Sequence, residues 1–282
     1  MKHHATMSFV LAALLLPASA ARAQQRPLVT QDPETIGAGR ILVEGGLDYG
    51  RDILFPVSGL KGNLLRAPLI GVMFGISSIA EVEITGGLHN RLTITDRVAA
   101  PLSSMLEVPG DTTTDVEDIV FATKIRVLSE SESRPAIGLR FATRLPNASN
   151  ESGLGTDTTD FLASALVGKT VRSLRVVGNI GVGILGDPTR GDRQNDVVTY
   201  GLSLARAMTN EVELVGEING RASTRSEAPP GTESRSAMRF GARYTRGPAR
   251  FDAAALVGMT ERDPSIGFAV GVTYIFNAFK VQ

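Results

Sequence analysis

Residues 266–276 read IGFAVGVTYIF, a stretch in which bulky apolar side chains alternate with smaller ones. Successive side chains of a β-strand point to opposite faces, so a period of two predicts a strand. One face carries Ile266, Phe268, Val270, Val272, Tyr274 and Phe276. The other face carries only glycine, alanine, threonine and one isoleucine. The two faces of this strand are therefore expected to meet very different surroundings.

Upstream of this stretch the same period continues, but the second face of each segment becomes charged. In residues 211–214, for example, Val212 and Leu214 alternate with Glu211 and Glu213. A face with this many ionisable groups cannot form the core of a soluble protein. We predict twelve strands, at residues 40–49, 64–76, 80–94, 116–128, 135–145, 158–170, 172–185, 196–207, 211–222, 235–246, 249–260 and 265–276.

The gaps between the predicted strands alternate in length. Longer polar gaps occur at residues 50–63, 95–115, 146–157, 186–195 and 223–234, and short ones at residues 77–79, 129–134, 208–210 and 247–248. Outer-membrane barrels show this alternation, because their periplasmic turns are short and their extracellular loops are longer. A soluble sandwich would also alternate, but its strands are usually shorter. The sequence therefore predicts an all-β fold, a transmembrane antiparallel up-and-down β-barrel of about 12 strands.

The start of the chain predicts export. Residues 1–23 combine Lys2, an apolar run at residues 9–16 and a terminal Ala21-Arg22-Ala23, the features of a cleaved signal peptide. We expect residues 24–39 to form a periplasmic N-terminal segment, residues 40–276 the outer-membrane barrel of a Gram-negative cell envelope, and residues 277–282 a short C-terminal tail.

Composition excludes several kinds of chemistry and partner. Cysteine is absent, so disulfides, a lipidated cysteine and thiolate sites cannot occur. Lys plus Arg equals Asp plus Glu, at 29 each, which gives no basic footprint for nucleic acid. We expect no cofactor and no metal site.

The charged side chains that the alternation directs inward form the candidate functional site. The predicted lumen-lining residues are Lys124, Arg126, Arg140, Arg144, Glu213, Glu217, Arg239 and Arg243. The four basic residues between positions 124 and 144 predict a basic patch, which would attract anionic solutes and set the selectivity of a channel. A network that only fills a narrow barrel is the other interpretation, because about eight strands leave no channel and sixteen leave a wide one.

His89 is the only histidine that remains after the predicted signal peptide. An outer-membrane hydrolase of the serine type would need such a residue as its general base. The alternation directs His89 into the lumen beside Glu83 and Arg91, which predicts a polar wall residue. We therefore expect no catalytic residue.

The C-terminal stretch also predicts a partner. The pattern formed by Gly271, Tyr274 and Phe276 resembles the signal by which the outer-membrane assembly machinery recognises its substrates. Outer-membrane lipid and small solutes are the other expected partners, and the oligomeric state stays open.

The middle of the chain resembles a known family. Glu117-Asp118-Ile119, residues 124–126 and 134–141, Leu145-Pro146-Asn147, and residues 153–156 and 179–181 resemble the outer-membrane transporter family labelled for the MetA pathway of phenol degradation. The resemblance implies an outer-membrane barrel that takes up small, often aromatic compounds, and it supplies no catalytic residues.

The resulting functional prediction is a porin-like channel or transporter that passes small solutes, aromatic or anionic, through a charge-lined lumen. Two alternatives stay open. The barrel could serve a structural or surface-recognition role through its extracellular loops, or it could be an outer-membrane hydrolase.

Overall fold

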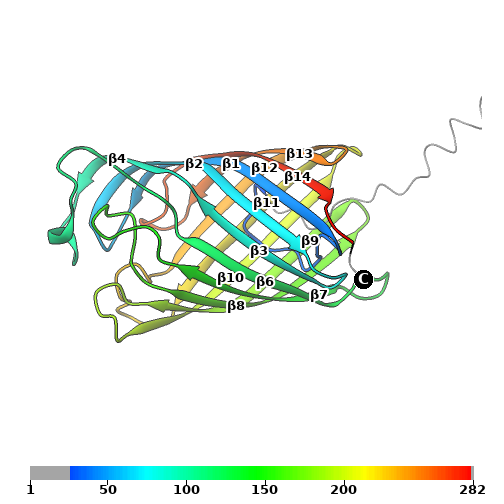
Figure 1. Ribbon diagram of the computed structural model, residues 1–282, viewed down its shortest axis with the longest axis horizontal. Helices are drawn as coiled ribbons and strands as arrows, with labels where there is room; N and C mark the ends of the chain where they lie inside the picture. The colour runs from blue at the N-terminus through cyan, green and yellow to red at the C-terminus, as the bar shows by residue number, and fades with distance from the viewer. Residues whose placement is uncertain (1–25, 281–282) are drawn as a thin grey trace, which may run out of the picture.

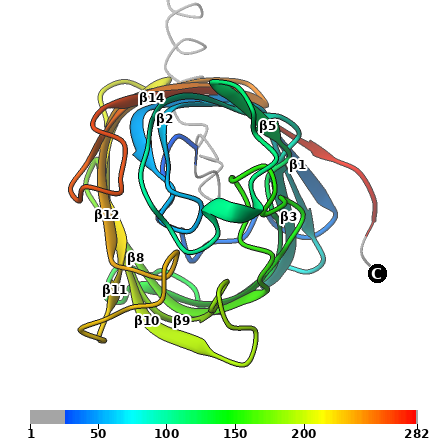
Figure 2. The ribbon, with the colours of Figure 1, turned by 90° about the vertical axis from the view of Figure 1, so that its left-hand side faces the viewer.

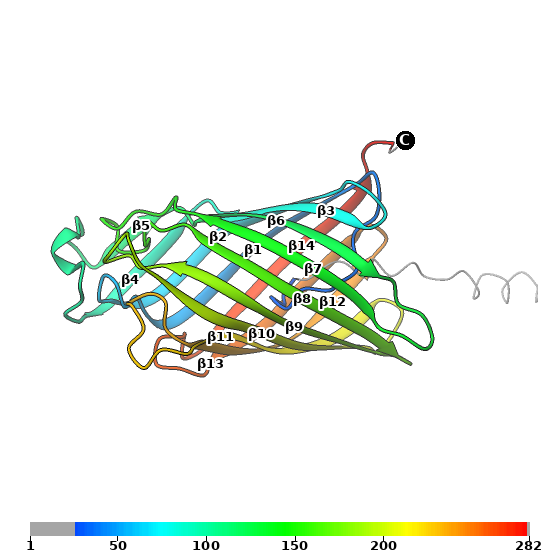
Figure 3. The same cartoon turned by 90° about the horizontal axis from the view of Figure 1, so that it is seen from below.

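The structure, a computed structural model, describes residues 26–280, and the predicted signal peptide lies outside the described residues. Antiparallel strands lie side by side and form a long cylinder (Figures 1 and 3). The sheet closes on itself because the first strand pairs with both the second and the last. The elements are β1 (Arg40–Leu54), β2 (Leu60–Gly75), β3 (Ala80–Gly87), β4 (Asn90–Arg97), η2 (Ser103–Met105), β5 (Thr112–Asp115), β6 (Ile119–Leu128), β7 (Ala136–Leu145), β8 (Asp160–Val171), β9 (Leu174–Gly186), β10 (Gln194–Ala207), β11 (Val212–Ser223), β12 (Arg235–Arg246), β13 (Ala249–Gly258) and β14 (Gly267–Asn277).

The fourteen strand elements make a barrel of twelve strands, because two of the strands are broken. β3 and β4 pair with successive parts of β2 and together form one strand. β5 and β6 pair in the same way with β4 and β3. The predicted antiparallel barrel of twelve strands is therefore confirmed.

The outer surface of the barrel is apolar. In β10, Leu202 and Leu204 are exposed, whereas Ser203 and Ala205 between and beside them are buried against the interior. The other exposed outward side chains include Phe121, Leu139, Phe141, Phe161, Ile180, Val182, Leu214, Phe240, Tyr244, Phe251, Phe268, Val270, Val272, Tyr274 and Phe276. A soluble protein rarely exposes an apolar patch above a few hundred Å². This face therefore fits acyl chains, and closure leaves no strand edge unpaired in lipid.

No helix in residues 26–280 is long and apolar enough to cross a membrane.

The longer connections gather at one end of the cylinder, the loop end, and the short turns at the other, the turn end (Figure 1). β1 and β2 pair further than expected, to Leu54 and Lys61, so the predicted gap at residues 50–63 shrinks to residues 55–59. The paired extension has an apolar inner face, on which residues of three loops pack. The apolar cluster on this face consists of Ile53, Leu60, Leu64, Leu92 and Ile94, with Phe55, Leu106, Val108 and Leu154 against it.

The alternation in β4 is opposite to the predicted one. Leu92 and Ile94 are buried, whereas His89 and Arg91 are exposed on the outside of the wall. β2 carries one more residue than β1 near Pro68, where their register shifts, and the neighbouring strand breaks opposite this point. An extra residue exchanges the two faces of a strand from that point on. The prediction that His89 and Arg91 line the lumen is therefore wrong.

Candidate functional site

The lumen contains a piece of the protein's own chain. Residues 26–39, which the sequence places in the periplasm, follow the inner wall of the barrel at the turn end and lead into β1; the dark blue trace lies inside the ring of strands in Figure 2. Gly46 and Gly271, which face each other across β1 and β14, make room for the guanidinium of Arg26. Pro33 packs against Gly138 and Gly168 in the same way. A Cβ atom at these glycines would meet the segment.

Polar side chains of the wall hold the main chain of this lumen segment, residues 26–39. The carboxylate of Glu217 accepts hydrogen bonds from the backbone N–H groups of Val29 and Thr30, each at 2.8 Å. The side-chain amide of Asn179 accepts from the N–H of Gln31 at 2.6 Å and donates to its carbonyl at 2.8 Å. Side chains of the wall thus provide hydrogen-bond partners for the main chain of this segment, as a neighbouring strand would.

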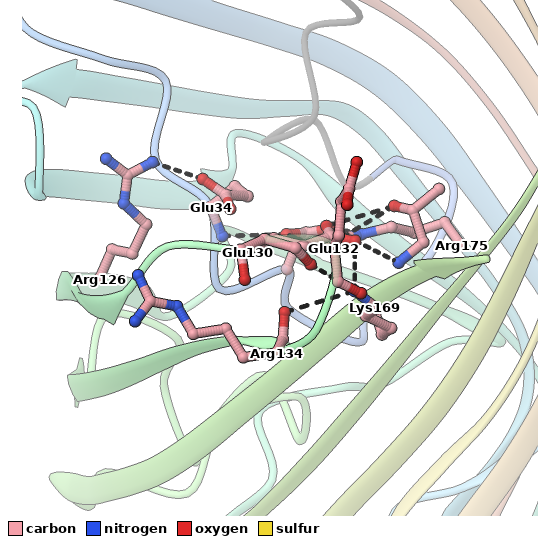
Figure 4. A network of polar contacts seen from close by, with 10 residues as sticks. Glu34, Arg126, Glu130, Glu132, Arg134, Lys169 and Arg175 are labelled. Atoms are coloured by element: carbon pink, nitrogen blue, oxygen red, sulfur yellow. Dashed lines mark hydrogen bonds and ion pairs between the residues drawn. The ribbon is translucent and has the colours of Figure 1, made fainter. Parts of the chain in front are cut away.

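Two ion pairs fix the next residues of the lumen segment (Figure 4). Asp32 receives two hydrogen bonds from the guanidinium of Arg175, at 2.9 and 2.7 Å. Glu34 pairs with Arg126 at 2.5 Å. Arg175 also pairs with Glu130, at 2.5 Å, and so joins the segment to the turn between β6 and β7. Planar guanidinium groups bind carboxylates in this two-pronged way.

Two wall arginines hold the beginning of the lumen segment. The Nε of Arg243 donates to the carbonyl of Arg26, and a terminal nitrogen of Arg239 donates to the carbonyl of Pro27, each at 2.8 Å. Half of the lumen-lining residues predicted from the sequence thus contact residues 26–39. These are Arg126, Glu217, Arg239 and Arg243.

Lys124 forms a fully buried polar contact in the wall. Its side chain is 0% exposed and lies between Glu81 and Glu83, with Nζ–Oε distances of 2.7 and 3.7 Å. Arg140 pairs with the second of these carboxylates at 2.9 Å. The first also accepts the N–H of Ile36, at 2.6 Å, which ties the network to the lumen segment.

The remaining predicted lumen residues are also paired. Arg144 pairs with Asp160 and lies 3.6 Å from Asp118. Glu213 lies 3.8 Å from the guanidinium groups of both Arg243 and Arg250. Each residue of the predicted basic patch thus has a carboxylate partner, either on the wall or on residues 26–39, and the patch is charge-compensated.

Open space lies on the loop side of the lumen segment. A cavity of about 520 Å³ has Val29, Thr30 and Gln31 in its lining. A second, of about 360 Å³, is lined by the ends of β1, β2, β11 and β12 and by loop residues that include Leu154. The two cavities share the same three arginines, which are Arg144, Arg221 and Arg235.

Arg221 and Arg235 are site residues that the prediction did not include. They occupy the same faces of β11 and β12 as Glu217 and Arg239, and they stand directly opposite each other in the register. The alternation that selected the predicted pairs also selects these two. This signal alone was therefore enough to find them.

The predicted assembly residues lie apart from this site, except for one. Tyr274 and Phe276 are exposed on the outer face with ring centroids 6.0 Å apart. Gly271 faces inward, beside Arg26. The contact with Arg26 explains a small residue at this position, and the role of the three residues in assembly stays a prediction.

Comparison with known proteins adds to the fold. No family model and no curated protein sequence matches the chain. The COG4313 outer membrane channel from Pseudomonas putida F1 has a similar structure, with a TM-score of 0.61, 12% identity, and coverage of 87% of this chain and 98% of that chain. The NanC porin has a TM-score of 0.49, 9% identity, and coverage of 86% and 100%. At such identities a likeness shows the fold alone: the chain folds as an outer-membrane β-barrel.

Proposed function

We propose that this barrel is an outer-membrane channel that lets small solutes pass through its lumen and past residues 26–39. The observation that carries the proposal is the open space of about 360 and 520 Å³ in a lumen whose turn side is occupied by the chain itself. Wall side chains alone do not fill this barrel, as expected for a strand number between eight and sixteen.

The way in which residues 26–39 are held supports passage. Their contacts with the wall are mostly hydrogen bonds and ion pairs, such as those of Asp32 with Arg175 and of Glu34 with Arg126. Apolar contacts are small clusters, of which Leu28 with Ala205 and Val215 is one. Polar contacts exchange readily with water, so the segment can yield to a solute more easily than a packed apolar core could.

The same geometry argues against the two alternatives. His89 is the only histidine of residues 26–280, and it lies outside the lumen and away from the cavities, so a serine-type hydrolase would have no histidine there. A purely structural barrel would have no use for the open space in the lumen. The fold shared with a protein called an outer membrane channel agrees with the proposal. Uptake of aromatic compounds, implied by the family resemblance, belongs to the same proposal.

Solute flux into liposomes tests this function. Vesicles that contain the full chain are expected to swell in an iso-osmotic solution of a small sugar, because the solute enters through the lumen. Protein boiled before reconstitution serves as the control. Folded protein that gives no swelling and no current above protein-free vesicles would reject the channel and favour a surface-recognition role.

A further inference from the structure

Two arginines at the loop end of β11 and β12 face the lumen cavities without a carboxylate partner. Arg221 donates to the main-chain carbonyls of Glu233 and Gly231, at 2.9 and 2.5 Å. Arg235 donates to the carbonyl of Leu54 at 3.2 Å, and its Nε is buried without a hydrogen-bond partner. Within residues 26–280 neither guanidinium forms an ion pair.

The cavity of about 360 Å³ therefore has a surplus of positive charge. Its lining contains five arginines but only two acidic residues; these are Arg66, Arg144, Arg221, Arg235 and Arg239, with Asp48 and Asp263. Asp263 is already engaged by the N–H of Ser236 and the hydroxyl of Thr260, at 2.9 and 2.6 Å. Asp48 lies within 3.9 Å of both Arg66 and Arg239. The other three arginines of the lining each have a carboxylate partner, so the surplus positive charge lies at Arg221 and Arg235.

The other carboxylates near this pair have partners of their own. Asp160 pairs with Arg144, and Glu233 lies 3.5 Å from Arg262. Among the described residues of the cavity lining, Asp263 is the one acid without an ion pair, and it lies beyond ion-pair distance of both guanidinium groups, so two positive charges share a single unpaired carboxylate.

Apolar side chains line another part of the same cavity. They include Ile53, Phe55, Leu64, Leu154 and Leu256. A guanidinium binds a carboxylate through two parallel hydrogen bonds, and the pairing is stronger where the surroundings are poor in water. Apolar walls favour an apolar body by about 25 cal/mol per Å² of buried surface. The cavity also lies within the usual size range of small-molecule pockets.

We propose that Arg221 and Arg235 form a binding subsite for a small organic carboxylate, whose apolar body rests on Phe55, Leu154 and Leu256. The subsite defines the class of solute that the proposed channel would carry. Its role in transport rests on the proposed channel function. The carboxylate replaces the missing acidic partner between β11 and β12, and the apolar side chains separate such a solute from small hydrophilic anions.

Calorimetry on the purified, detergent-solubilised chain tests the subsite without requiring transport. Benzoate is the probe, acetate lacks the apolar body, and benzyl alcohol lacks the charge. Benzoate is expected to bind more tightly than either of the other two, because only benzoate meets both halves of the cavity. Equal affinities for benzoate and acetate, or the absence of benzoate binding, would overturn the proposal.

Substitutions locate the site. Arg221→Gln together with Arg235→Gln should weaken benzoate binding by about tenfold or more, since a hydrogen bond to a charged group contributes about 1.5–3 kcal/mol. Arg91→Gln removes an exposed arginine from the outside of the wall and should leave the affinity unchanged. Unaltered binding in the double variant would refute the assignment.

A second variant guards against misfolding of the first. Thr156→Glu keeps both arginines and their bonds to main-chain carbonyls, but it places a competing carboxylate in the lining of the same cavity. It should also weaken benzoate binding, and full affinity in this variant would count against the subsite. Benzoate binding without liposome flux would reject the channel and keep the subsite, whereas flux without such binding would do the reverse.

Discussion

Deletion of residues 26–36 is expected to raise the single-channel conductance severalfold. These residues occupy the turn side of the lumen, where they contact β1, β6, β9, β11, β12 and β14. Their removal leaves the turn side of the lumen open, and a wall of twelve strands can enclose a channel. The measurement is the current step in planar lipid bilayers, compared with that of the full chain.

Truncation after Asn277 is the matched control for this deletion. It removes residues that follow β14 and donate hydrogen bonds to the carbonyl of Gly39, just before β1. The conductance should therefore not change. A second variant, Glu217→Ala, keeps residues 26–36 but removes the acceptor for Val29 and Thr30, and it should give noisier current. Equal conductance of the folded deletion variant and the full chain would show that residues 26–36 do not limit passage.

Lys124→Met is expected to destabilise the barrel by about 3–5 kcal/mol, the usual cost of removing one partner from a buried ion pair. Lys124 is fully buried, and Glu81 and Glu83 are each only 1% exposed. Without the ammonium group, two carboxylates share a buried site with Arg140 as the single cation. Unfolding in urea, followed in lipid vesicles, measures the free energy.

A second substitution distinguishes charge from packing at this site. Glu81→Gln in the Lys124→Met background leaves Arg140 balanced by Glu83, and the amide oxygen can still accept the N–H of Ile36. Much of the lost stability should return. Lys61→Met, on the outer side of β2, should change stability by no more than about 0.5 kcal/mol. A loss below about 1 kcal/mol in the single variant would contradict the buried network.

The barrel could be predicted from the sequence because each strand carries its own signal. Alternation within a segment and the lengths of the gaps are local patterns, and together they gave the strand number and order. The error in β4 is local as well. One extra residue near Pro68 exchanges the faces, and nothing in the alternation of residues 80–94 marks where the exchange occurs.

The contents of the lumen could not be predicted in the same way. Residues 26–39 have no period of two, and their partners lie far along the chain, as with Asp32 and Arg175. An arginine on a lumen wall gives the same sequence signal whether it meets a solute or another part of the chain. Gly46 and Gly271 offered a faint clue, because two facing glycines leave space that something must occupy.

The central claim is that successive side chains of each strand point in turn to the acyl chains outside and to a water-filled lumen inside. The chain has no cysteine, so single cysteines at positions 139, 140, 141 and 142 of β7 can carry a spin label one at a time. In lipid vesicles, labels at 139 and 141 should be relaxed mainly by oxygen, and labels at 140 and 142 mainly by a water-soluble nickel complex. Relaxation that does not alternate along these four positions would contradict the barrel in lipid and the lumen with it.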